Sequence, residues 1–135
     1  MILYIYIQVK RLQEVNFGSP LTPLLKTLKD EVIMIEVDNH SESFLVNQCL
    51  PLILEANQLI LHSEVEEGEA IGPLKSIFEK LRKTDKPVLN LVQGNHQGIS
   101  SMFKLMKVDS KSISKSLEAK THISEFLKLG INSKN

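Results

Sequence analysis

The feature that most limits what this chain can fold into is a nearly continuous apolar run that begins after Pro87 and ends before Gly94. Its members are Val88, Leu89, Leu91 and Val92. Such runs are typical of strands buried on both faces, as in parallel sheets with helices above and below. Apolar residues then recur at the spacing of one helix face. These are Ile99, Met102, Phe103 and Met106. The run therefore predicts a buried strand, a sharp turn at Gly94 and an amphipathic helix.

The preceding sequence repeats this alternation. β-Branched and aromatic residues predict strands over residues 1–9, 32–37 and 59–62. Helices are predicted after Thr22-Pro23, with Thr22 as the N-cap, over residues 41–56 and from Gly72-Pro73 onward. Because Pro51 removes one internal hydrogen bond, the helix over residues 41–56 should kink or break near residues 47–51.

The polar sequence after residue 106 gives a weaker pattern. Residues 108–109 fit a short edge strand, whereas residues 110–116 have the composition of a linker. Apolar residues between Leu117 and Leu127 predict a final helix, for which Gly130 is the expected end.

This order of elements predicts an α/β fold, a three-layer α/β/α sandwich around a mostly parallel sheet. We expect four or five strands, with the flavodoxin-like order 2-1-3-4 for the first four. The alternative is a mixed sheet of the kind found in anti-sigma-factor antagonists, although their Asp-Ser-Ser-Gly turn is absent. One domain is expected over residues 1–130, with a frayed tail over residues 131–135.

Composition argues against several classes of function. Lysine and arginine balance aspartate and glutamate at 16 each, and tryptophan is absent, so nucleic acid is not an expected partner. The apolar run over residues 1–9 is too short to span a membrane, and its basic residues follow it, unlike those of a signal peptide. A lone cysteine, Cys49, fits a reducing compartment. We therefore expect a cytoplasmic protein with no membrane contact.

Opposite charges gather in two separate segments. Residues 63–69 are strongly acidic, whereas lysines outnumber acidic residues by seven to three over residues 104–135. Such segments are usually solvated, but this layout leaves open a homo-oligomer or a protein partner.

Three of the four histidines fall at or just beyond predicted strand ends. They are His40, His62 and His96, and Asp38, Glu64, Glu66 and Glu67 accompany them. Because parallel strands end along one edge of a sheet, these side chains are expected near each other. Histidine and carboxylate groups together can bind zinc, manganese or iron, or act as general acids and bases.

The order Asp38-Asn39-His40, Ser63-Glu64-Val65-Glu66-Glu67 and Gly94-Asn95-His96-Gln97 resembles the motif series of calcineurin-like metallophosphoesterases. The resemblance implies two divalent metals. Asp38 and His40 would bind the first, Glu64 would bridge both, and Asn95 would bind the second. His96 would be the acid, so the catalytic candidates are His96 and Glu64. The chain departs from the family pattern at four positions. The family has glycine where this chain has Ser63, and aspartate where it has Glu64 and Glu67. It has an acidic residue at the position of Gln97.

Each of these residues also has a structural explanation. Asn95 or Gln97 could cap the helix that follows, His62 could be a core histidine, and the acidic segment could be solvated surface. The favoured prediction is therefore a non-catalytic binding or regulatory module. The alternative is a divalent-metal-dependent phosphoester hydrolase, and the sequence does not decide between them.

Overall fold

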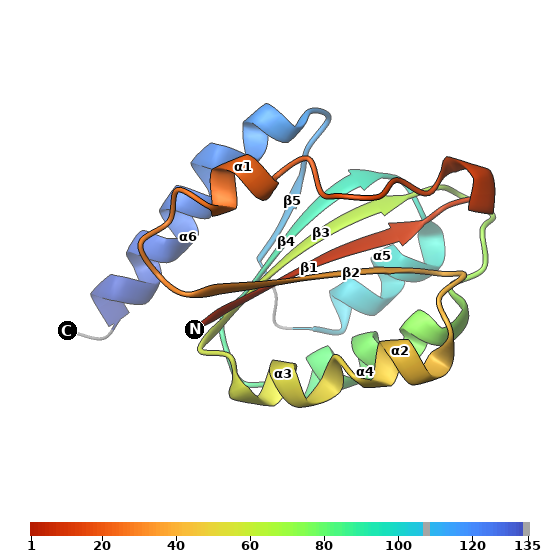
Figure 1. Cartoon of the computed structure of the whole chain (residues 1–135), viewed down its shortest axis with the longest axis horizontal. Coiled ribbons are helices and arrows are strands. Elements are labelled where there is room, and N and C mark those ends of the chain that lie inside the picture. The colour runs from red at the N-terminus through yellow and green to blue at the C-terminus, as the bar shows by residue number, and fades with distance from the viewer. Residues whose placement is uncertain (107–108, 134–135) are drawn as a thin grey trace.

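The computed structural model of the protein describes residues 1–106 and 109–133. Five strands alternate with helices along the chain (Figure 1). The strands are β1 (Ile2–Val9), β2 (Val32–Asp38), β3 (Gln58–Val65), β4 (Val88–Gly94) and β5 (Asp109–Ser112). The α-helices are α1 (Thr22–Leu25), α2 (Ser43–Asn47), α3 (Leu50–Glu55), α4 (Lys75–Lys83), α5 (Gln97–Lys104) and α6 (Ala119–Ser133). The 3-10 turns are η1 (Leu12–Glu14), η2 (Gly72–Leu74) and η3 (Ser116–Glu118).

The strands form one sheet in which every described pair is parallel, in the order β2-β1-β3-β4-β5. The predicted flavodoxin-like order is thus confirmed, and the mixed-sheet alternative is wrong. The fifth strand, however, lies mainly in the segment predicted as a linker. An apolar pattern could not indicate this strand, because all its residues are polar: Asp109, Ser110, Lys111 and Ser112. Val108, which was predicted to begin the strand, lies outside the described residues.

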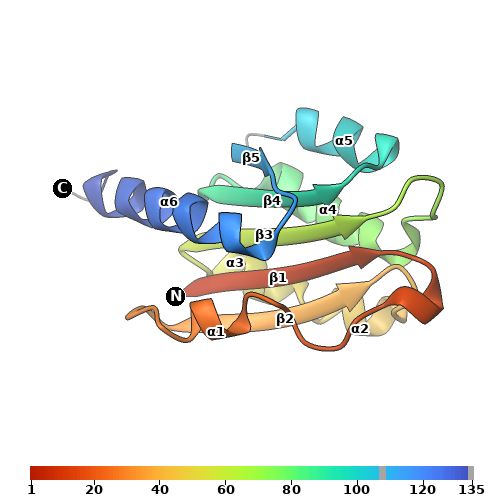
Figure 2. The same cartoon turned by 90° about the horizontal axis from the view of Figure 1, so that it is seen from above.

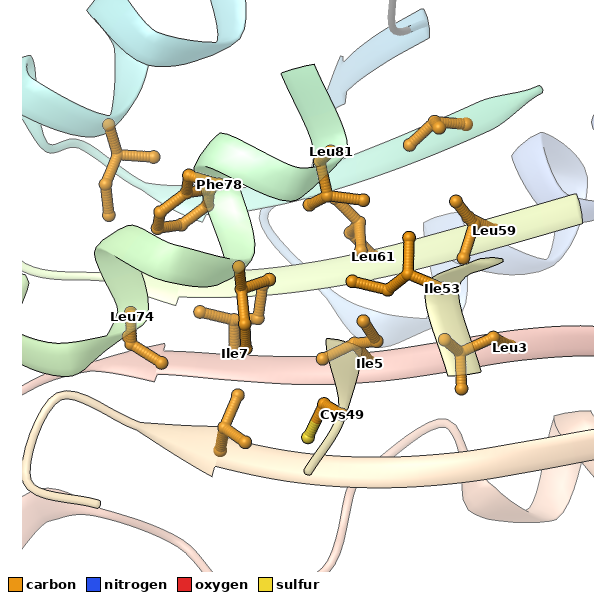
Figure 3. Close-up of a cluster of buried hydrophobic side chains, with 14 of the residues drawn as sticks. Leu3, Ile5, Ile7, Cys49, Ile53, Leu59, Leu61, Leu74, Phe78 and Leu81 are labelled. Carbon is orange, nitrogen blue, oxygen red and sulfur yellow. The ribbon is translucent and has the colours of Figure 1, made fainter. Parts of the chain in front are cut away.

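Helices cover both faces of the sheet, with α1 and α6 on one face and α2 to α5 on the other (Figures 1 and 2). The larger core lies beneath α2 to α5, where residues of β1 and β3 face residues of α3 and α4 (Figure 3). The interior strand β1 is buried along all 8 of its residues. Apart from Gln8, its sequence is accordingly apolar or aromatic on both faces, as expected for a strand between two helix layers.

Several predicted boundaries need correction. The helix predicted over residues 41–56 does break, between α2 and α3, close to Pro51 as expected. Thr22 does not cap α1, because the N-cap is Leu21 and makes no side-chain bond. The third strand extends beyond His62 to Val65, since its polar residues find buried partners. The last helix continues through Gly130 to Ser133; glycine costs a helix only about 1 kcal/mol.

The cap of α5 is His96, and neither Asn95 nor Gln97. The Nδ1 atom of His96 accepts a hydrogen bond from the backbone N–H of Ile99 at 3.2 Å. An imidazole nitrogen here takes the place of the usual side-chain oxygen. In the described part of the chain, no helix is both long and apolar enough to cross a membrane.

Gly94 ends β4 because its backbone approaches β3 too closely for any side chain. Its φ is 95°, and a Cβ atom added there would lie 2.2 Å from the carbonyl oxygen of Val65. Gly18 offers a matched comparison, with a φ of 89° and no atom within 4 Å of an added Cβ.

We expect Gly94→Ala to lower the free energy of unfolding by about 3 kcal/mol or more, because strain adds to a backbone clash. Gly18→Ala should cost only about 1–2 kcal/mol, the strain alone. Urea unfolding of both variants measures the difference. Equal losses would contradict the close packing of β4 on β3.

Candidate functional site

Polar side chains gather on the α1/α6 face near the carboxyl ends of β1 and β3. The register pairs Tyr6 with His62 and Gln8 with Glu64, so these residues share one face of the sheet. The segment over residues 10–21 runs back across this face before α1 begins (Figure 1). His62 and Gln8 are almost completely buried beneath it, at 0% and 2% exposure.

One chain of hydrogen bonds passes through His62. The Gln93 side-chain N–H donates to the Ser114 carbonyl at 3.4 Å, which turns Gln93 Oε1 toward His62 Nε2 at 3.2 Å. His62 therefore carries its proton on Nε2, and its Nδ1 accepts from the Tyr4 hydroxyl at 3.2 Å. Because that hydroxyl has only one proton, Ser19 Oγ donates to it, at 2.5 Å. This chain ties the segment before α1 to the middle of the sheet.

A second group surrounds Glu64. Its Oε1 lies 2.7 Å from Lys10 Nζ, and its Oε2 accepts a hydrogen bond from the Tyr6 hydroxyl. Lys10 Nζ also donates to Gln8 Oε1 at 3.2 Å. The Lys10 and Glu64 side chains are only 11% and 13% exposed, so removing one charge would leave the other buried without a partner, which is strongly destabilising. The pair occupies the β1/β3 switch point, where doubly wound folds often bind ligands.

Burial sets the protonation of this cluster. It lowers the pKa of His62, although the Gln93 hydrogen bond and the Glu64 carboxylate act in the opposite direction. Burial also raises the pKa of the Tyr4 and Tyr6 hydroxyls well above the ordinary value. His62 and both tyrosines are therefore neutral at pH 7. The ion pair between Lys10 and Glu64 lies beside these neutral groups.

Most of the residues predicted as metal ligands and catalysts are bonded to other groups of the protein. Within residues 1–106 and 109–133, no group of three or more histidine, cysteine, aspartate or glutamate side chains could hold a metal ion. The Oδ1 atom of Asp38 accepts from the backbone N–H of His40, and His40 Nε2 donates to the Lys10 carbonyl, each at 2.7 Å. Glu64 binds Lys10 and Tyr6, and Asn95 is exposed.

His96 is engaged at both ring nitrogens. Nδ1 caps α5, and Nε2 donates to the Glu69 carbonyl at 2.6 Å. A ring used in this way has no free nitrogen to act as an acid toward a substrate. Glu67, in the neighbouring acidic segment, also has a partner: its Oε2 accepts a hydrogen bond from the Gln97 backbone N–H at 3.0 Å.

Sequence reasoning missed Tyr4, Tyr6, Lys10 and Gln93 as members of the buried cluster. The signal was present in the alternation of Tyr4, Tyr6 and Gln8, which puts three polar groups on one face of β1. Lys10 gave no such signal, because only the fold brings it to Glu64.

An open cleft of about 600 Å³ lies at the other side of the sheet, between α5 and the end of β4 and β5. Its lining comprises Val65, Val92, Gly94, Asn95, His96, Ile99, Ser100, Phe103, Lys104, Met106, Ser110 and Ser112. Ser110 and Ser112 pair with Asn90 and Val92 of β4, which turns their side chains toward α5. Buried apolar residues form the floor, and exposed polar residues form the rim.

No protein-family model matches this chain, and no curated protein or solved structure matches it either. Function must therefore be inferred from the geometry of the chain itself.

The burial of His62 makes stability depend on pH. Below pH of about 6.5 the unfolded chain binds a proton at His62 that the folded chain, with its lowered pKa, does not. This contribution to stability is thus lost as the pH falls from about 6.5 toward the folded pKa. Wild type should therefore lose more stability than His62→Gln between pH 7 and pH 5.5, measured by urea unfolding. Equal losses in the two proteins would contradict the neutral, buried imidazole.

Proposed function

We propose that this protein is a non-catalytic binding module and that its ligand occupies the cleft between α5 and β4–β5. The cleft carries this proposal, because it has the usual build of a small-molecule site. Such sites measure about 300–1,000 Å³ and combine an apolar floor with a few polar groups. The cleft volume of about 600 Å³ falls within this range.

The state of the predicted catalytic residues supports binding over catalysis. Glu64 is held by Lys10 and Tyr6, and both nitrogens of His96 are hydrogen-bonded within the protein. A general acid or base must reach the reacting group with a free donor or acceptor. No contact among the described residues favours the alternative, a metal-dependent phosphoester hydrolase.

The proposal includes a cytoplasmic location, because a chain with the single cysteine Cys49 cannot form an internal disulfide and fits a reducing compartment. The thiol of Cys49 is buried, and burial raises its pKa, which keeps it protonated and unreactive.

Self-association through opposite charges stays a prediction. Two carboxylates on which it was based, Glu64 and Glu67, bind Lys10 and the Gln97 N–H of their own chain.

Ser100→Phe tests the cleft directly, because Ser100 lies on its rim whereas its neighbour Ser101 is exposed and does not line it. The neutral dye Nile red should bind wild type and Ser101→Phe with equal affinity. Ser100→Phe should weaken dye binding by about tenfold, since the new ring fills part of the cleft. Fluorescence titration measures the affinities, and circular dichroism checks the fold.

The proposal fails if wild type does not bind the dye. It also fails if Ser100→Phe and Ser101→Phe bind it equally well.

A further inference from the structure

We infer that the cleft takes an amphipathic anion, a carboxylate on an apolar chain, with the chain on the floor and the carboxylate at Lys104. This inference rests on the proposed function, and it adds the chemical class of the ligand. Three features support it: the buried floor, the charge of the rim, and the state of the neighbouring carboxylates.

The floor of the cleft is apolar, and it packs against α4 on its inner side. Val65, Ile99, Phe103 and Met106 are each no more than 8% exposed. Phe103 packs edge-on against Phe78 of α4, with ring centroids 5.5 Å apart and an interplanar angle of 88°. A floor fixed in this way can bury methylene groups, each of which strengthens binding by about fourfold when fully covered.

The rim carries positive charge and hydrogen-bonding groups. Lys104, at the end of α5, is the one lysine or arginine among the described lining residues, and none of these residues is aspartate or glutamate. The hydroxyls of Ser100, Ser110 and Ser112 and the amide of Asn95 complete the polar rim. A carboxylate at Lys104 would therefore meet an ammonium and hydroxyl donors, with no competing acid among the lining residues that the structure describes.

Two acidic groups near the cleft already have partners. Glu67 accepts the Gln97 N–H at the start of α5, and Glu118, in the adjoining hollow, accepts from Ser114 Oγ at 2.7 Å. His96 offers the ligand no free ring nitrogen, because Nδ1 accepts the Ile99 N–H and Nε2 bonds to the Glu69 carbonyl. Among the side chains that the structure describes, no carboxylate lies within ion-pair distance of Lys104.

Three probes with a decyl chain separate charge from apolarity: decanoate, decanol and decylammonium. Their affinities for wild type, Lys104→Gln and Lys104→Arg are measured by Nile red displacement at low salt. Wild type should prefer decanoate over decanol by about fivefold, as expected for an exposed ion pair, and should bind decylammonium most weakly. The preference should disappear in Lys104→Gln, persist in Lys104→Arg and decrease in 0.5 M salt.

The outcomes distinguish this inference from the function on which it rests. If all three probes bind wild type equally, or if Lys104→Gln keeps the preference for decanoate, the anionic class is wrong and the cleft remains a binding site. If no probe binds wild type, both the ligand class and the proposed function are wrong.

Discussion

An all-parallel sheet has to be covered on both faces, and this requirement governs the whole structure. On one face α2 to α5 supply a continuous apolar layer. On the other, α1 has only 4 residues, so α1 and α6 do not reach the whole sheet. Met34 of β2, which shares this face with Tyr4, is 40% exposed as a result.

Polar contacts take the place of the missing helical layer near the carboxyl ends of β1 and β3. Buried polar groups are costly unless they find partners, and here the partners belong to the protein itself. Lys10 pairs with Glu64, and Tyr4 joins Ser19 to His62. These side chains occupy the switch point between β1 and β3, where many doubly wound folds bind ligands. The open cleft lies instead beside β4 and β5, at the edge of the sheet. There β5 has only 4 residues and follows a short helix, α5, which leaves space between them.

The sequence predicted those parts of the fold that depend on local pattern. The apolar run of β4, the aromatic and β-branched β1 and the break at Pro51 all appear where periodicity and proline chemistry put them. It did not predict the polar half of β3, and it indicated a fifth strand only over residues 108–109, because a polar residue in a strand looks like a loop residue until its partner is known. The site was harder still. His40 and His96 do follow strand ends, but their ring nitrogens bond to backbone groups that no sequence pattern reveals.

The central claim is that Glu64 stabilises the fold through its buried ion pair with Lys10. Urea unfolding of Glu64→Gln tests it most directly, with Glu36→Gln as the control, because Glu36 is an exposed carboxylate on the same face of the neighbouring strand. Glu64→Gln should lose about 2–4 kcal/mol of stability, since it leaves the Lys10 ammonium buried without its carboxylate, whereas Glu36→Gln should change stability by less than about 0.5 kcal/mol. Unchanged or increased stability in Glu64→Gln, as is common when a catalytic residue is replaced, would contradict the account.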